Sequence, residues 1–216
     1  SHSLAVTMAY QGVARGIQID SMRIDVEGKL DLQGLLGLDE AVKPGFKSIH
    51  VTAHVDSPNS SAEVYELFRY AQGRCPIAAT VGQPVNVEWI FDIEQSPAGP
   101  ETGEMRHGVN AADLAATVAA VQDNPVLARC RFLGSMEWLG GTRGRSTSPG
   151  FDQAEGDLTI RHRDPEPKGY TGDEPAILMG DDSGPSSAEA LLQSMANCVT
   201  VTSSYHAAAR GMALDA

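Results

Sequence analysis

Residues 184–211 read GPSSAEALLQSMANCVTVTSSYHAAARG, and this stretch decides the interpretation of the chain. Ser186 and Glu189 have the spacing of a capping box, in which each side chain accepts from the backbone N–H of the other residue. The pattern predicts a long helix that runs to Arg210 and stops at Gly211. Its side chains are apolar or small on nearly all faces: Leu191, Leu192, Met195, Ala196, Val199 and Ala209. Such a helix is expected to be central and buried.

The first twenty residues repeat the end of this helix in one ungapped register. The matches are Val6-Thr7 with Val201-Thr202, Tyr10 with Tyr205, Ala14-Arg15-Gly16 with Ala209-Arg210-Gly211, and Asp20 with Asp215. Two alanine-rich helices can look alike by chance, but the identical residues at the helix exit oppose that interpretation. Ser3 then occupies the position of Cys198. The chain is therefore expected to begin inside one copy of a buried helix and to end just after another.

Three segments alternate apolar and polar residues, which is typical of half-buried strands in an antiparallel sheet. They lie at 22–32, 49–55 and 85–93, with Gly28 as a candidate bulge. Further strands are predicted at 132–138, where the strand leads into the glycine-rich loop 140–150, at 158–160 and at 177–179. These strands fall into two groups with helices between the groups, which favours an α+β fold over a series of βαβ units.

Two more helices and a linker complete the expected organisation. Residues 64–71 have helical apolar spacing behind a capping box at Ser60 and Glu63, and Pro76 is expected to end this helix. Residues 110–122 predict a helix with Asn110 as its N-cap. Residues 95–108 carry proline, glycine and charge without an apolar period, so we interpret them as a linker.

Composition narrows the class of protein. The chain has 216 residues, is 42% hydrophobic, and carries 28 acidic against 16 basic residues for a net charge of -12. This balance argues against nucleic acid and membrane surfaces as partners, because both require a basic surface. No apolar run is long enough to cross a bilayer, and no secretory signal is recognisable. Three cysteines are too few for a disulfide scaffold, so we expect reduced thiols in the cytoplasm.

Four stretches together resemble the OsmC/Ohr family of hydroperoxide-reducing proteins. Residues 184–211 resemble the central helix that carries the family's first cysteine, and YELFRYAQGRCPIAATV (65–81) resembles its second-cysteine segment. MEWLGGTRGRSTSPGF (136–151) is similar to the early strands and the arginine-bearing loop. VEGKLDLQGLLGLDEAVKPGFKSIHVTAHVDS (26–57) is similar to the strands that follow the central helix. The resemblance implies antiparallel sheets wrapped around long central helices, in an intertwined dimer or swapped assembly.

The order of these stretches departs from the family. Residues 1–94 resemble the later half of an OsmC-like unit, 95–109 join the halves, and 110–216 resemble the earlier half. The chain is either a piece of a tandem protein or a permuted unit with a duplicated helix. In both cases the halves are expected to combine into one set of strands and one pair of cysteines, within one chain or between two, because each half alone leaves open sheet edges.

The resemblance assigns catalytic roles to five residues. Cys198 would be the peroxidatic thiol and Cys75 the resolving thiol, with Arg145, or else Arg143, holding the thiolate and Glu189 orienting the arginine. From the residues alone, other roles compete. A cysteine in an alanine-rich helix is usually a small core residue, a loop arginine is usually solvated, and Glu189 already has a capping role. Arg74 and Pro76 place Cys75 near a surface.

The function expected from this resemblance is the reduction of organic hydroperoxides by a thiol peroxidase. The apolar substrate pocket would include Trp138, Met195 and Tyr205, and a small dithiol or lipoylated protein would supply electrons. The alternative is a non-catalytic dimeric module that binds a small apolar ligand in the same cleft. A half-unit that folds only as a swapped oligomer is a third interpretation. Cys130 is interpreted as structural and His206 as packed rather than as a base. No cysteine or histidine pair has zinc-site spacing, so neither metal nor cofactor is expected.

Overall fold

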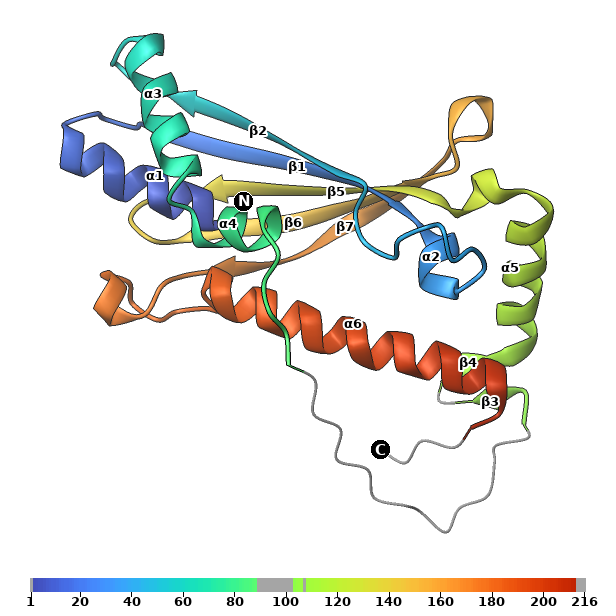
Figure 1. Cartoon of the computed structure of the whole chain (residues 1–216). Helices are drawn as coiled ribbons and strands as arrows, with labels where there is room; N and C mark the ends of the chain where they lie inside the picture. Colours follow the sequence, from blue (N-terminus) through green and yellow to red (C-terminus); the bar gives the residue numbers. More distant parts are fainter. Residues whose placement is uncertain (1, 89–102, 107, 213–216) are drawn as a thin grey trace.

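One five-stranded antiparallel sheet organises the molecule, in the order β2-β1-β5-β6-β7 (Figure 1). The computed structural model describes residues 2–88, 103–106 and 108–212. The strands are β1 (Ser21–Asp31), β2 (Ser48–Asp56), β5 (Arg129–Trp138), β6 (Gly144–Gln153) and β7 (Ile160–Gly172). Strand β1 pairs with β5, so the sheet joins strands from the leading and the trailing parts of the sequence. The fold is α+β, as expected.

Strands β1 and β2 form where the sequence alternates. Met22 and Ile24 are buried on one face of β1, while Arg23 is exposed on the other. The predicted bulge at Gly28 is wrong, because this residue pairs in regular register with both neighbouring strands. The ring of Phe46 instead lies where a side chain on Gly28 would be, 2.7 Å from an ideal Cβ. Close approach of an aromatic ring is thus the reason for glycine here.

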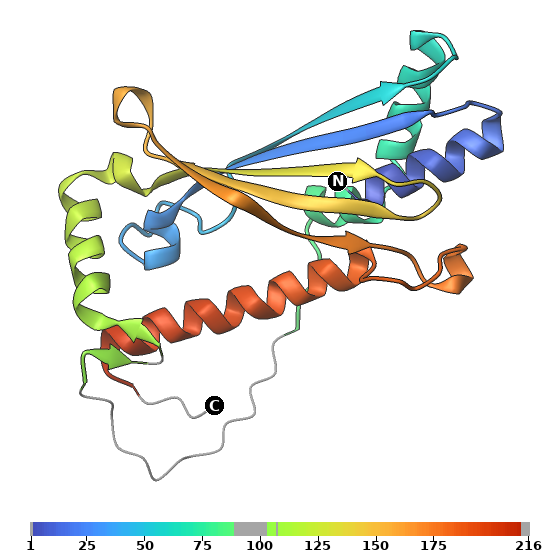
Figure 2. The same cartoon turned by 180° about the vertical axis from the view of Figure 1, so that it is seen from behind.

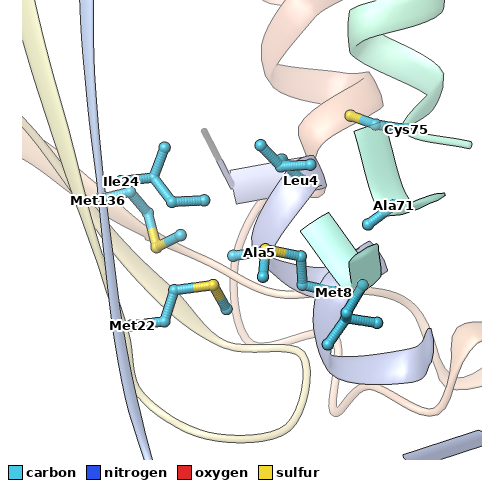
Figure 3. Close-up of a cluster of buried hydrophobic side chains, with 9 residues drawn as sticks. Leu4, Ala5, Met8, Met22, Ile24, Ala71, Cys75 and Met136 are labelled. Carbon is cyan, nitrogen blue, oxygen red and sulfur yellow. The ribbon is translucent and has the colours of Figure 1, made fainter. Parts of the chain in front are cut away.

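Three helices cover one half of the sheet. They are α1 (His2–Arg15), α3 (Ser61–Gln72) and α4 (Pro76–Gly82), which lie together at the same end of the strands in both views (Figures 1 and 2). Leu4, Ala5 and Met8 of α1 pack in the core shown in Figure 3. The core residues from the sheet, α3 and the start of α4 that surround them form what we call the helix-docking surface: Met22, Ile24, Leu67, Ala71, Cys75 and Met136.

Local caps place the helix ends where the sequence predicts them. Both capping boxes are present, at Ser60 with Glu63 in α3 and at Ser186 with Glu189 in α6 (Ser187–Arg210). Asn110 caps α5 (Ala111–Asp123) by accepting from two backbone N–H groups. The expected stop at Pro76 is different, because α3 already ends at Gln72 and the proline begins α4. Proline suits a first helical position, where its missing N–H costs no hydrogen bond.

The burial predicted for α6 is wrong. Its middle is exposed, and in α6 only Ala207 and Ala208 are buried among the described residues. The helix runs beneath the sheet in Figures 1 and 2, and it contacts α4, α5, α1 and the β3–β4 hairpin. The physical reason lies in the repeat, because α1 occupies the position against the sheet that a second copy of the same helix would need.

The remaining elements are short, and several differ from expectation. They are α2 (Leu32–Leu36), a hairpin of β3 (Met105–Arg106) and β4 (Val109–Asn110), and 3-10 turns at Pro125–Ala128, Gly156–Leu158 and Ala176–Leu178. The last turn replaces the strand predicted at 177–179. Residues 85–88 are not in a strand, and the rest of the strand predicted at 85–93 lies outside the described residues, as does most of the predicted linker.

Candidate thiol site

Cys75 lies in the core rather than near a surface, which corrects the sequence interpretation. It is the N-cap residue of α4 and only 3% exposed. Figure 3 shows its sulfur on the same side of the core as Leu4 of α1. Cys75 lies between the end of α3 and the start of α4, and its thiol faces α1.

The polar contact of the Cys75 thiol is with Ser3. Cys75 Sγ donates to Ser3 Oγ at 3.2 Å, and both side chains are buried. Ser3 is the residue of α1 that the repeat aligns with Cys198 of α6. The position that holds Cys198 in α6 is thus occupied by Ser3 in α1. In this structure it is Ser3 that lies directly beside Cys75.

Cys198 is exposed near the middle of α6 and is a free thiol. Cys75 is also free, so the structure does not link the two cysteines, and their pairing stays a prediction. Cys130 is buried on β5, as expected for a structural cysteine. Burial, together with the negative charge of Asp31, raises the pKa of the Cys130 thiol, which makes it a poor nucleophile.

The two arginines occupy different environments. Arg143 lies in the turn between β5 and β6, where its backbone bonds to Gly140 and Leu139. Arg145 was expected in a loop, but it lies within β6 and its guanidinium is 3.5 Å from the carboxylate of Glu137.

The strand geometry assigns a face to Arg145. Met136 is fully buried in the core, and the next residue, Glu137, faces the other side of the sheet because strand side chains alternate. Arg145 is opposite Glu137 in register and therefore shares its face. Arg145 thus lies on the opposite face of the sheet from Cys75. The expected role of Arg145 in stabilising a thiolate stays a prediction.

Glu189 has the capping role. Its carboxylate accepts from the backbone N–H and the hydroxyl of Ser186, at 2.8 and 2.7 Å. These two hydrogen bonds lower the pKa of Glu189. His206 also has a structural role, since its Nε2 lies 3.2 Å from the carbonyl oxygen of Leu35.

A buried polar cluster at the start of α1 was missed by sequence reasoning. His2 is 3% exposed, and neither ring nitrogen has a hydrogen-bond partner among the described residues. The ring is closely confined, because an ideal Cβ on Gly144 would lie 2.6 Å from His2 Nδ1. Glu174 Oε1 is 3.9 Å from His2 Nε2. Burial lowers the pKa of His2 and raises that of Glu174. No spacing in the sequence signals this pair.

Asp173, next to Glu174, is fully buried and accepts hydrogen bonds from several donors. Thr142 Oγ1 and Ser183 Oγ lie at 2.5 and 2.7 Å, and backbone N–H groups of residues 174, 181 and 183 complete the set. Burial alone would raise the pKa of Asp173, but these hydrogen bonds outweigh it and hold the pKa well below its usual range. Asp173 therefore ties the loop that precedes α6 to the turn between β5 and β6.

An apolar hollow of about 550 Å³ lies beside α1. Its lining includes Tyr10, Val13, Ile17, Trp138 and Met179. Of the three residues expected in a substrate pocket, Trp138 lines this hollow, whereas Met195 and Tyr205 lie on α6 and do not. Tyr10, the residue of α1 that the repeat aligns with Tyr205, takes that place instead.

The described residues contain neither a membrane-spanning helix nor a cluster of metal-ligating side chains. No helix in the described ranges has the length and apolarity needed to cross a membrane. Within the same ranges, no group of three or more histidine, cysteine, aspartate or glutamate side chains is arranged to hold a metal ion.

Comparison with known proteins supports the family assignment through the first part of the chain. The family model described as OsmC-like protein matches residues 1–90, which include α1, both strands of the leading part and Cys75. The match leaves the order of the two halves untested. A comparison with curated proteins gave no match. Residues 1–90 are thus similar to the OsmC-like protein family.

Proposed function

We propose that the protein is a thiol-dependent peroxidase that reduces organic hydroperoxides, with Cys198 as the peroxidatic and Cys75 as the resolving thiol. The observation that carries this proposal is the 3.2 Å contact between Cys75 Sγ and Ser3 Oγ. It supports a fold in which the helix position held by Cys198 in α6 adjoins a second thiol. Cys198 is itself exposed and free, as a thiol that must meet a peroxide has to be.

The proposed reaction proceeds in three balanced steps. The Cys198 thiolate attacks the terminal oxygen of the hydroperoxide, the O–O bond breaks, and the alcohol leaves after taking up a proton. Cys198 is then a sulfenic acid. The Cys75 thiol attacks this sulfur, so that a disulfide forms and water leaves. A small dithiol or a lipoylated protein restores both thiols by disulfide exchange and becomes oxidised itself.

The two thiols require a rearrangement to meet, because α1 covers Cys75 in this structure. Helix α6 already contacts α4, whose N-cap is Cys75. We propose a swapped homodimer, in which α6 of a second copy replaces α1 on the helix-docking surface. The exposed apolar residues of α6 support this arrangement, since burial would remove Leu192, Met195 and Val199 from water.

Cysteine variants test the proposal. The intact protein receives one equivalent of cumene hydroperoxide, followed by peptide mapping without reductant and by turnover with a dithiol. We expect a Cys75–Cys198 disulfide in the wild type. Cys198→Ser should abolish turnover, and Cys75→Ser should stop at the sulfenic acid, which dimedone traps. Cys130→Ser is the matched control and should keep turnover. A Cys198 thiol that stays reduced in the folded protein would sink the proposal.

A second function has its own supporting observation. The hollow beside α1 is lined mainly by apolar side chains and adjoins a helix that has no cysteine, which suits non-catalytic binding of a small apolar ligand. In that case Cys198→Ser should leave the affinity for a fatty-acid probe unchanged. Val13→Asp should weaken binding about tenfold or more, because it places a charge in the lining. Loss of turnover with retained probe binding in Cys198→Ser would separate the two functions.

A further inference from the structure

Two arginine side chains lie against the ring of one tyrosine where α1 and α3 pack together (Figures 1 and 2). The guanidinium carbon of Arg15, at the end of α1, is 3.7 Å from the centre of the Tyr70 ring. The guanidinium carbon of Arg74, just after α3, is 4.5 Å from the same centre. Tyr70 belongs to the last turn of α3 and is 37% exposed, so a solute can reach it. We call these three side chains the arginine–tyrosine cluster.

The two guanidiniums of the cluster have no carboxylate partner. Neither Arg15 nor Arg74 forms an ion pair among the described residues. The chain as a whole has a net charge of -12, so carboxylates are abundant in it. Contact with the face of the ring attracts each cation but supplies no negative charge. Two positive charges therefore stand close together without a counter-ion from the described part of the chain.

Both guanidiniums also act on the hydroxyl group of Tyr70. Hydrogen bonding from Arg15 is the main cause that lowers the pKa of Tyr70, and the charge and hydrogen bonding of Arg74 add to this effect while burial opposes it. Negative charge on an oxygen is thus stabilised at this point. Donors remain for further oxygens, because a guanidinium has five N–H groups and Arg15 uses only Nη1 for its two hydrogen bonds to Gln11.

We propose that the arginine–tyrosine cluster binds a phosphate group. A phosphate monoester carries about 1.5 to 2 negative charges at pH 7 and three acceptor oxygens, which match two positive charges and two forked sets of donors. A carboxylate offers one charge and two oxygens, which suffice for one guanidinium. Neither thiol chemistry nor a second copy of the chain enters this proposal, so it is independent of the proposed peroxidase function.

A purely structural role for the arginines is the competing explanation, because cations near a helix C-terminus offset its partial negative charge. Arg69 is the matched control for this role. It also lies in the last turn of α3, but among the described residues only Arg15 and Arg74 lie over the Tyr70 ring. The structural role predicts similar behaviour for Arg69 and Arg74, whereas a phosphate site requires Arg74 and not Arg69.

Phosphate titration of the intact protein tests the proposal, followed by proton–nitrogen NMR at low ionic strength. We expect saturable shifts of the amide signals of Arg15, Tyr70 and Arg74, with a Kd for inorganic phosphate on the order of 1–10 mM because the site is open to water. Arg15→Gln and Arg74→Gln should each raise this Kd about tenfold, and Arg69→Gln should change it less than about twofold. Sodium chloride at about 0.5 M should weaken binding several-fold, because salt screens exposed charges. Circular dichroism establishes that each variant is folded.

Further probes define the ligand. Phenyl phosphate should bind about as tightly as inorganic phosphate, and acetate about tenfold more weakly. Cys198→Ser should bind phosphate like the wild type, which separates this inference from the peroxidase proposal. Tighter binding of a glutamate hexapeptide than of phosphate at the same residues would overturn the proposal in favour of an acidic protein partner. The proposal is also overturned if no saturable shift occurs up to about 50 mM phosphate, or if Arg69→Gln weakens binding as much as Arg74→Gln does.

Discussion

Helices α1 and α6 share a repeated sequence pattern but differ in burial. Leu4 of α1 is 7% exposed, whereas its counterpart Val199 in α6 is 38% exposed. The helix-docking surface accounts for the difference, because α1 is packed against it and α6 contacts mainly other helices and a short hairpin. A sequence that is apolar on nearly all faces of a helix thus indicates only that the helix can be buried. Whether it is buried depends on which helix packs on the helix-docking surface.

The two helices also differ at the position of Ser3 and Cys198, both in burial and in whether a thiol is present. In α1 this position is buried beside Cys75 but is occupied by serine. In α6 it is a cysteine, but the side chain is exposed and apart from the core. Each copy has one of the two features that a two-cysteine site needs. The proposed peroxidase function therefore requires either a second copy of the chain or a change in which helix packs on the helix-docking surface.

Removing core volume from α1 should have the largest effect on stability. Met8 is fully buried in the core, so Met8→Ala should lower the free energy of unfolding by about 2–5 kcal/mol. Met195 on α6 is 38% exposed in the single chain, so the same substitution there should cost only about 0.5 kcal/mol at protein concentrations at which the chain is monomeric. Urea unfolding at fixed protein concentration measures both.

Equal losses in these two variants would contradict the difference in burial. They would mean that Met195 is covered in solution, which is what a swapped homodimer predicts. Unfolding at several protein concentrations distinguishes the cases, because the stability of a dimer depends on concentration while that of a monomer does not.

The sequence predicts local features well because their causes are local. The capping box of Ser60 and Glu63 needs only four residues, and the alternation in β1 needs only the residues of that strand. The glycine-rich stretch 140–150 was interpreted as a loop for the same local reason. Most of it nevertheless becomes β6, because β5 and β7 supply hydrogen-bond partners on both sides. Arg145 accordingly lies on a strand.

The candidate site could be predicted only in part. The repeat identified Ser3 as the counterpart of Cys198, and the cysteine-proline segment identified Cys75. The burial of Cys75 and its contact with Ser3 depend on how α4 folds back against α1, which no local pattern encodes. The pair of His2 and Glu174 joins residues 172 positions apart, and no local pattern connects the two.

Substitution of Asp173 tests how strongly the loop that precedes α6 is held against the sheet. At pH 7, Asp173→Asn should cost about 2–4 kcal/mol, because an amide offers one acceptor oxygen to several buried donors. The pKa of Asp173 is lowered in the folded protein, so its carboxylate contributes stability above the unfolded pKa, near 3.9. That contribution is lost as the pH falls through the folded pKa.

The difference between wild type and Asp173→Asn should therefore narrow below about pH 4. Thermal unfolding from pH 7 to pH 2.5 measures it, with Asp181→Asn as the control because that carboxylate lies in the same loop and is exposed. A difference that stays constant across this range would show that the hydrogen bonds to Asp173 are not selective for its charged form.

The smallest expected effect concerns the first turn of α6. Ser186→Ala removes one half of the capping box and should cost about 1 kcal/mol locally, as should Ser60→Ala in α3. The two losses should spread differently, because α3 contributes Leu67 and Ala71 to the core while the first turn of α6 does not belong to it. Ser60→Ala should therefore lower global stability, and Ser186→Ala should mainly speed hydrogen exchange in the first turn of α6. If both variants lower the global free energy of unfolding equally, α6 unfolds together with the core. The side chains of α6 would then be exposed because they lack a packing partner, and not because the helix unfolds independently of the sheet.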